Sequence, residues 1–274
     1  MQLTEKQVRD FQKIIYDHYK KFGRDFPWRN TTDQYPIFIS EVMLQQTQTS
    51  RVAKKYDTFL HVFPSFHALA RAELFDVLRA WQGLGYNRRA KFLHQSAKEI
   101  ISTYDGEIPK DVNLLRKLPG IGTATAGSIA AFAFNKPTVF VETNIRAVLI
   151  HLFLQNKDNI PDKKLLYLAQ QTLDKKNPRI WYYAITDYGV HLKSQGINPI
   201  NKSKSYTKQS KFEGSTRQIR GKIIKLLLSD TTLTKEQVLK RIKLVRTEIK
   251  ASQIEKIINK LVEEKILSQS FSFD

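Results

Sequence analysis

Apolar residues recur at helical spacing along most of the chain, and strict alternation of apolar and polar residues is rare. Residues 4–22 show the pattern clearly, with Phe11, Ile14 and Ile15 on one face. A second helix is expected to open at Pro36 and to run to Thr49. Further helices are predicted over 51–62, 66–72, 74–80, 88–104, 111–117, 123–134, 143–154, 163–173 and 178–191. The chain should therefore be all-α over roughly its first 200 residues.

The composition changes after His191. Between Lys193 and Lys225 there are nine basic residues and one acidic residue, Glu213, and large apolar residues are few at its start. Such a segment is typical of an extended basic strap that follows DNA, or of a solvated linker. The sequence leaves both interpretations open.

The last sixty residues have a pattern of their own. An amphipathic helix is expected from Thr216 to Leu228, and Thr234 and Gln237 begin a second, short helix with a capping box. A third helix should run from Ala251 to Glu264 with an isoleucine-rich face, and residues 266–273 alternate like a strand. This order predicts a winged helix-turn-helix whose third helix enters the major groove; a helical cap that contacts protein is the alternative.

The net charge of +19, from 45 Lys and Arg against 26 Asp and Glu, favours a phosphate-rich partner. A basic, solvated surface without a nucleic-acid partner would give the same number. No apolar run approaches the ~20 residues that span a bilayer, and the first residues lack a signal-peptide pattern. We therefore expect a cytoplasmic protein without a membrane partner. The absence of cysteine excludes disulfides, thiolate zinc sites and cysteine-ligated iron–sulfur clusters.

The most specific local pattern is Leu118-Pro119-Gly120-Ile121-Gly122, ahead of a helix rich in small residues. Both glycines permit a positive φ and a close approach of the backbone. The free N–H groups of the following helix start form a phosphate site. A carboxylate, Glu142, follows that helix. A phosphate clamp beside an acid suits an enzyme that acts on a DNA nucleotide, although a plain helical hairpin with a surface glutamate is also possible.

Four motifs in order, PWR at 27–29, EVMLQQTQ at 41–48, WQGLGY at 81–86 and LPGIG at 118–122, resemble the helix–hairpin–helix (HhH-GPD) DNA glycosylases. Within that superfamily the chain resembles adenine DNA glycosylases of the MutY type. The resemblance covers residues 10–192 and implies a two-lobed catalytic body over 1–192. A basic linker over 193–214 and a winged-helix-like domain over 215–274 would follow. The implied partner is double-stranded DNA with a mismatched or damaged base, bound by a monomer.

The resemblance also implies roles for individual residues. Cleavage of a purine N-glycosidic bond suits two carboxylates, one protonated and one ionised. Glu41 would protonate adenine at N7, Glu142 would stabilise the electron-deficient sugar, and Asn144 would orient the carboxylate or the base. From the residues alone, Glu41 could instead be a helix N-terminal acid and Asn144 a helix N-cap. The implied base pocket comprises Trp28, Arg29, Tyr86, Ala124 and Asp187. The implied DNA contacts are Gln46, Thr47, Arg88, Gly120, Ile121, Gly122, Thr123 and Thr125.

The chain departs from the family at several places. The family reads Asp-Gly-Asn where this chain has Glu142-Thr143-Asn144, and its second tyrosine after the glycines is Asn87 here. Its four cluster-binding cysteines are replaced by a segment without ligands, from Leu192 to Pro199. We therefore expect no cofactor, apart from a structural monovalent cation at the hairpin. The tail is also too short for the Nudix-like domain of the family.

The predicted function is a monofunctional DNA glycosylase that flips out and removes adenine opposite 8-oxoguanine or G in base excision repair. Ala124 stands where bifunctional relatives carry a Schiff-base lysine, so strong lyase activity is not expected. The alternatives are a mismatch thymine or uracil glycosylase of the same fold, and a non-catalytic DNA-binding protein.

Overall fold

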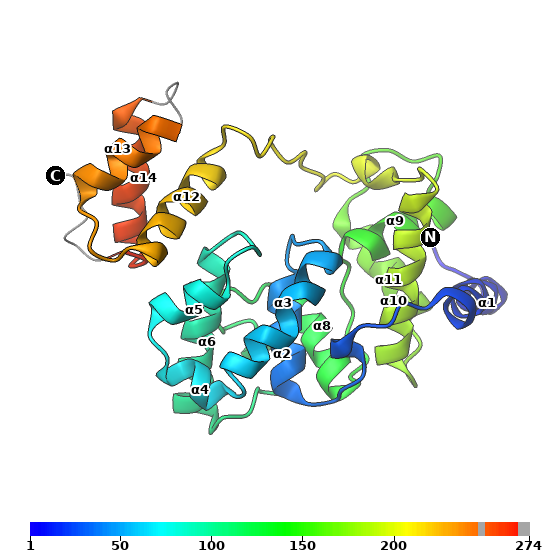
Figure 1. Cartoon of the computed structure of the whole chain (residues 1–274). Coiled ribbons are helices and arrows are strands. Elements are labelled where there is room, and N and C mark those ends of the chain that lie inside the picture. Colours follow the sequence, from blue (N-terminus) through cyan, green and yellow to red (C-terminus); the bar gives the residue numbers. More distant parts are fainter. Residues whose placement is uncertain (246–249, 268–274) are drawn as a thin grey trace. The chain divides into compact units, whose positions relative to one another are not determined.

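The computed structural model describes residues 1–245 and 250–267, and Figure 1 shows their helices. Over this part of the chain there is no β-strand, only an isolated parallel bridge between Ile160 and Ser203. This confirms the all-α prediction. The described chain forms two compact units: residues 1–45 with 107–208, here the first unit, and residues 46–106 with the described part of 209–274, here the second unit. The expected boundaries at 192/193 and 214/215 stay predictions.

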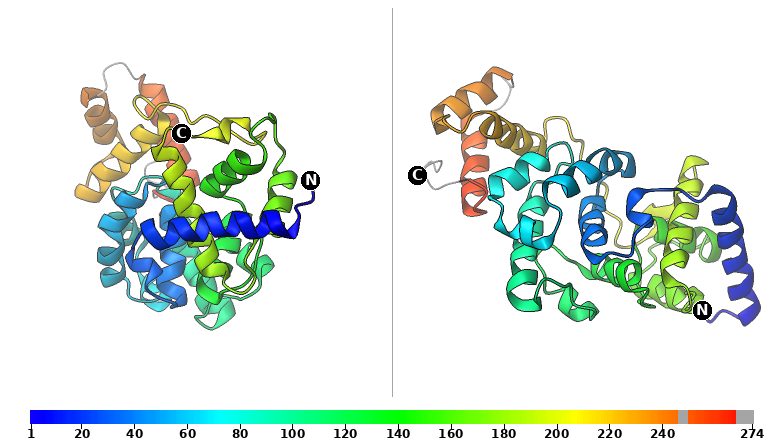
Figure 2. Two further views of the ribbon diagram at one scale, coloured as in Figure 1. Left: turned by 90° about the vertical axis from the view of Figure 1, so that its right-hand side faces the viewer. Right: turned by 60° about the horizontal axis from the view of Figure 1, so that its bottom comes forward.

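The first unit contains these elements: α1 (Glu5–Phe22), η1 (Pro27–Arg29), α2 (Gln34–Leu44), α7 (Val112–Leu115), α8 (Thr123–Phe134), α9 (Thr143–Phe153), α10 (Asp162–Thr172), α11 (Pro178–Ser194) and η2 (Pro199–Lys202). A capping box begins α1, because Thr4 accepts from the Gln7 backbone and Gln7 accepts from the Thr4 backbone. The buried face of α1, with Phe11 and Ile15, packs against α11, which it crosses in Figure 2.

Close helix packing brings the ends of the first unit's helices together. α2 packs on α8, and α9 packs on α11. At Gly189 in α11, an added Cβ would lie 2.5 Å from the Asn144 carbonyl oxygen and 2.7 Å from the Asn144 Cβ. At Gly127 in α8, an added Cβ would lie 2.9 Å from Phe140. Only glycine therefore permits these approaches, which fix where α9 begins relative to α8 and α11.

The second unit contains α3 (Thr49–Val62), α4 (Phe66–Arg71), α5 (Leu74–Ala80), α6 (Arg88–Tyr104), α12 (Thr216–Ser229), α13 (Lys235–Val245) and α14 (Ala251–Glu263). α6 packs on α4 and α5, and the three last helices pack on one another. Ile223, Ile254 and Ile258 are buried in that helical trio. The three predicted C-terminal helices are present. The predicted strand over 266–273 falls largely outside the described residues, so the winged helix stays a prediction.

The second predicted helix has the wrong bounds. α2 begins at Gln34, because the Asp33 side chain accepts from the Tyr35 backbone and caps it. It ends at Leu44, and Gln46 then adopts a left-handed φ of 53°. A residue in that conformation cannot continue a right-handed helix. The sequence prediction over 36–49 joined α2 to the start of α3, because the spacing of apolar residues does not reveal a turn of the backbone.

The segment after α11 is tied to the first unit. The Ile160 N–H donates to the Lys202 carbonyl at 2.8 Å, and the Lys204 N–H donates to the Ile160 carbonyl at 2.9 Å. Arg146, in α9, pairs with Asp162 and also donates to Ser203 Oγ at 2.7 Å. These bonds hold η2 against α9.

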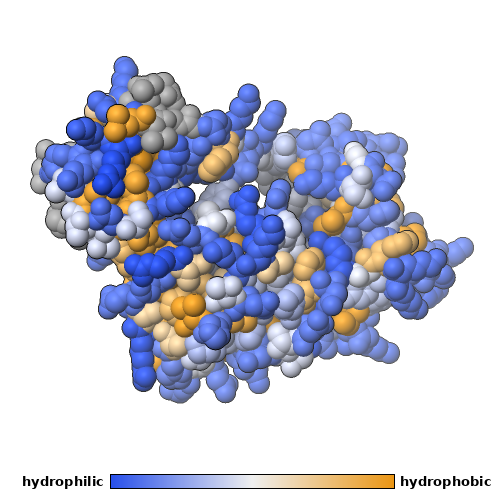
Figure 3. Space-filling view, viewed as in Figure 1, coloured by the Kyte–Doolittle hydropathy of each residue, from blue (hydrophilic) through white to orange (hydrophobic). Residues whose placement is uncertain are grey.

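Most of the face drawn in Figure 3 is hydrophilic, with smaller apolar areas between the polar side chains. Charged residues make up 26% of the chain and basic ones predominate among them. No helix of the described residues is long and apolar enough to cross a membrane.

Candidate active site

Glu41 lies in the third turn of α2 and is half-buried. Its neighbours Ile39 and Met43 are fully buried, and the Ser128 hydroxyl from α8 donates to Glu41 Oε2 at 2.5 Å. Burial raises the pKa of Glu41 to about 7, against the opposing effect of the Ser128 hydrogen bond. Because Glu41 stands far from the start of α2, the alternative of a dipole-stabilised N-terminal acid is wrong.

Glu142 is the N-cap of α9. Its Oε1 accepts from the Ile145 backbone N–H at 2.8 Å, and its Oε2 accepts from Asn144 Nδ2 at 3.1 Å. The alternative that Asn144 caps this helix is therefore wrong, because Asn144 is already the second residue of α9. Burial raises the pKa of Glu142, and the N–H donors act in the opposite direction.

The two carboxylates are close enough to influence each other. The charge of Glu142 raises the pKa of Glu41, and the charge of Arg29 lowers it. Both effects are smaller than burial and the Ser128 hydrogen bond, which come first. The fold thus unites two acids that are about a hundred positions apart in the chain, as general acid–base chemistry requires.

The hairpin at Leu118–Gly122 precedes α8. Gly120 has a φ of 77°, and the Ile121 N–H donates to the Leu118 carbonyl at 3.1 Å. Gly122, the N-cap of α8, has a φ of −84°, so of the two glycines that permit a positive φ only Gly120 adopts one. An added Cβ at Gly122 would meet nothing within 4 Å. Space in front of an uncovered helix start permits the close approach of a phosphate.

Arg29 and Asp187 form a buried ion pair, with side chains 8% and 1% exposed. Both Arg29 terminal nitrogens donate to Asp187, at 2.8 and 2.7 Å, and Arg24 donates to the same carboxylate from its backbone and side chain. Trp28 is buried and stacked on Phe26. Ala124 is half-buried in the first turn of α8. Contact of these residues with a base stays a prediction.

Residues 39–178 match the family described as the HhH-GPD superfamily base excision DNA repair protein. The chain belongs to this superfamily. The adenine DNA glycosylase of Mycolicibacterium smegmatis is 34% identical over 235 residues, which are 79% of each chain. The adenine DNA glycosylase of Buchnera aphidicola is 34% identical, over 78% of this chain and 63% of the relative. The human adenine DNA glycosylase is 32% identical, over 67% of this chain and 36% of the relative. The prediction that the chain belongs to the HhH-GPD superfamily of base excision DNA repair is confirmed.

Solved structures agree with this HhH-GPD fold. A thermostable thymine-DNA glycosylase superposes with a TM-score of 0.61 and 28% identity, over 67% of this chain and 86% of that one. A non-covalent endonuclease III–DNA complex superposes with a TM-score of 0.56 and 20% identity, over 68% and 86%. The second likeness supports the fold alone.

In the second unit, Arg89 joins the residues after α2 to the residues after α5. Its guanidinium donates to Thr47 Oγ1 at 2.7 Å and to the Leu84 carbonyl at 3.2 Å. Gln46 is exposed. Tyr86 has a φ of 50°, and its hydroxyl accepts from Arg217 at 2.7 Å. Arg88 forms an ion pair with Glu264, which also pairs with Arg220 at 2.6 Å. DNA contacts of Gln46, Thr47 and Arg88 stay predictions, as does a place for Tyr86 in the base pocket.

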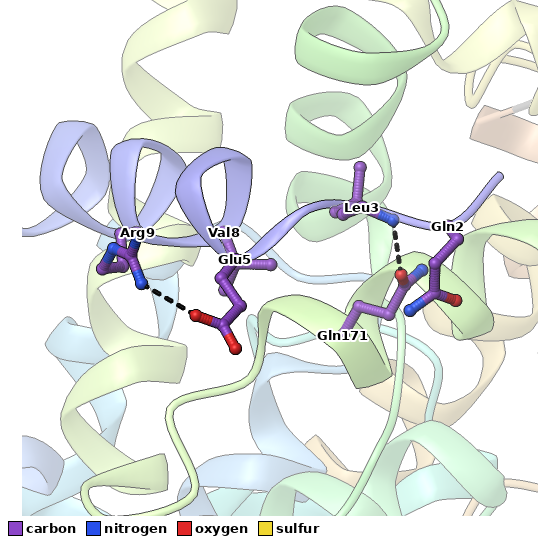
Figure 4. Close-up of a pocket in the computed structure, with 6 residues that line it drawn as sticks. All are labelled: Gln2, Leu3, Glu5, Val8, Arg9 and Gln171. Carbon is purple, nitrogen blue, oxygen red and sulfur yellow. Dashed lines mark hydrogen bonds and ion pairs between the residues drawn. The ribbon is translucent and has the colours of Figure 1, made fainter.

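A hollow lined by residues of the N-terminus and by Gln171 includes neither Glu41 nor Glu142. Figure 4 shows the Leu3 N–H directed to Gln171, and Arg9 directed to Glu5; Gln2 and Val8 complete the lining. No group of three His, Cys, Asp or Glu side chains among the described residues is arranged to hold a metal ion.

Sequence reasoning missed several residues of the HhH-GPD site. Ser128, Gly189 and Arg24 contact Glu41, Asn144 and Asp187 respectively. A serine inside the alanine-rich stretch 124–133 was a usable signal, because a buried hydroxyl needs a partner. Nothing in the sequence indicates that Arg24 would turn towards Asp187.

Proposed function

We propose that the protein removes adenine, mispaired with 8-oxoguanine or G, from double-stranded DNA by hydrolysing the N-glycosidic bond. The observation that carries this proposal is a glutamic acid, Glu41, whose pKa burial raises to about 7 beside a second carboxylate, Glu142. A departing purine needs a proton, and the sugar it leaves becomes electron-deficient. The adenine DNA glycosylases among the relatives support adenine as the base.

The surroundings of the two acids favour a division of labour. Glu142 accepts two hydrogen bonds from N–H donors and stands at the start of α9, where the helix dipole favours negative charge. Glu41 accepts from one hydroxyl, in an apolar stretch of α2. We therefore assign the proton to Glu41, which donates it to adenine N7. Glu142 stays ionised and stabilises the developing positive charge on the sugar.

The hairpin supplies the grip on DNA. The backbone N–H groups of Gly120, Gly122 and Thr123, with the hydroxyl of Thr125, would bind phosphate, whereas the Ile121 N–H already donates to the Leu118 carbonyl inside the hairpin. Gln46 with Thr47 would hold the gap left by the flipped base. The hairpin carbonyls would also supply oxygen ligands to a monovalent cation. A monomer acting at the nucleoid in the cytoplasm, with the C-terminal helices as a winged-helix DNA-binding domain, completes the proposal.

The excision rate should follow the protonation of Glu41. Its carboxyl must carry a proton to act, so the single-turnover rate constant should fall as the pH rises through about 7. At low pH the rate should also fall, when Glu142 becomes protonated and loses its charge. A pH–rate profile of the wild-type protein at saturating enzyme checks this. A rate that increases steadily from pH 6 to pH 9 would contradict Glu41 as the acid.

A thymine glycosylase is the second candidate, because one of the solved structures that this chain resembles, at 28% identity, is a thymine-DNA glycosylase. The test uses duplexes with A opposite 8-oxoguanine, A opposite G, T opposite G and U opposite G, followed by alkaline cleavage of abasic sites. Cutting at adenine alone supports the proposal. Cutting at T or U alone would favour the second candidate. It would also remove the proposed role of Glu41, because thymine has no N7 to protonate.

The same assay without alkali tests for lyase chemistry. Ala124 provides no amine for a Schiff base, so strands should remain uncut until alkali is added. Borohydride should trap little covalent adduct. Efficient trapping would show that another amine attacks the sugar.

A further inference from the structure

Ser128 is a buried hydroxyl among alanines. It lies in α8, 6% exposed, between Gly127 and Ile129, and Ala126 and Ala130 around it are fully buried. A hydroxyl in such a place destabilises the fold unless it is hydrogen-bonded. Its partners are Glu41 Oε2 at 2.5 Å and the Thr125 carbonyl at 3.0 Å.

A hydroxyl has one proton and two acceptor lone pairs, so it can serve both forms of a carboxyl group. When Glu41 is ionised, the Ser128 O–H donates to it. When Glu41 is protonated, Glu41 donates to Ser128 Oγ, and the Ser128 proton turns to the Thr125 carbonyl. A backbone N–H could not accept the proton of the acid form, and a carbonyl oxygen could not donate to the ionised form.

We propose that Ser128 is a positioning residue that holds the Glu41 carboxyl in one place before and after it gives up its proton. The inference rests on the proposed function, in which Glu41 is the general acid. Ser128 touches neither base nor sugar in this account. It acts through the orientation of Glu41.

Ser128 is one of several groups that set the pKa of Glu41. Burial raises the pKa of Glu41, the Ser128 hydrogen bond lowers it, Glu142 at the start of α9 raises it and Arg29 in η1 lowers it. From α11, the phenol of Tyr183 also interacts with Glu41. Removing the Ser128 hydroxyl should therefore raise the pKa of Glu41 further, because an opposing effect is lost.

The test compares Ser128→Ala with wild-type protein in single-turnover excision of adenine between pH 5.5 and pH 9. We expect the maximal rate constant to be about 10-fold lower, with unchanged DNA affinity. The fall of the rate at high pH, here called the alkaline limb, should lie about one pH unit higher than in the wild type. Ser128→Thr keeps the hydroxyl and should keep the wild-type alkaline limb. An alkaline limb of Ser128→Ala that coincides with that of the wild type would overturn the inference.

A matched control is Ser40→Ala. Ser40 is 1% exposed, belongs to the same helix as Glu41 and donates to the Ile37 carbonyl at 2.8 Å. Its loss should leave rate and alkaline limb unchanged. A ¹³C carboxyl NMR titration of Glu41 without DNA tests the role of Ser128 separately from the proposed adenine glycosylase activity. An inactive wild type would defeat the proposed function, whereas an equal Glu41 midpoint in wild type and Ser128→Ala would defeat the inference alone.

Discussion

Glu41→Gln should reduce the single-turnover rate of adenine excision about a thousandfold, while the affinity for an A·8-oxoguanine duplex stays within about twofold. Glutamine retains the size and hydrogen-bonding capacity of the side chain but has no proton to give. Single-turnover kinetics and a fluorescence-anisotropy titration measure the two quantities. Glu107→Gln, at an exposed position of the first unit, is the control and should behave like the wild type. Wild-type excision by Glu41→Gln would remove Glu41 from the mechanism.

The same variant should be more stable than the wild type above pH 7. The pKa of Glu41 is raised from 4.5 to about 7, so its contribution to stability is complete below pH 4.5 and is lost as the pH rises through 7. Glutamine is neutral throughout and avoids that loss. The difference in unfolding free energy should grow to the order of 3 kcal/mol by pH 8. Urea denaturation at pH 5 and pH 8 also shows that the inactive variant is folded.

Asp187→Asn should lower the free energy of unfolding by about 3–5 kcal/mol at pH 7, the range for breaking a buried ion pair. The carboxylate is 1% exposed and is the shared partner of Arg29 and Arg24, whose positive charges would then face each other. Urea denaturation measures the loss. Asp76→Asn breaks an exposed pair with Arg79 and should change stability by less than about 0.5 kcal/mol.

The effect of Asp187→Asn should depend on pH in the opposite sense to that of Glu41→Gln. Burial alone would raise the pKa of Asp187, but Arg29 and Arg24 hold it below its usual value. Its contribution to stability is therefore present above about pH 4 and is lost as the pH falls through the lowered pKa. An equal loss at pH 7 and pH 2 would contradict the ion pair as the cause.

Several elements could be predicted from the sequence because their signals are local. α6 and α8 have the predicted bounds, 88–104 and 123–134. Apolar residues at helical spacing mark α6, and a run of small apolar residues after Gly122 marks α8. The start of α2 and the break after Leu44 were missed. That break depends on the left-handed backbone of Gln46, which apolar spacing does not report.

The candidate site was predictable where a motif names its residues, as at Glu41, Glu142 and the hairpin. The partners that adjust these residues were not, because they depend on which helices meet. Ser128 reaches Glu41 only because α8 packs on α2, and Gly189 approaches Asn144 only because α11 packs on α9. Sequence patterns fix helix faces, whereas such pairings follow from three-dimensional packing.

The most direct test of the central claim is to identify the base that the wild-type protein releases. An A·8-oxoguanine duplex is incubated with excess protein at pH 7, and the small molecules are separated and weighed by mass spectrometry. The account predicts one free adenine for each abasic site formed, with the DNA strand unbroken. Tightly bound DNA without any released adenine would contradict it and would indicate a binding protein rather than an adenine glycosylase.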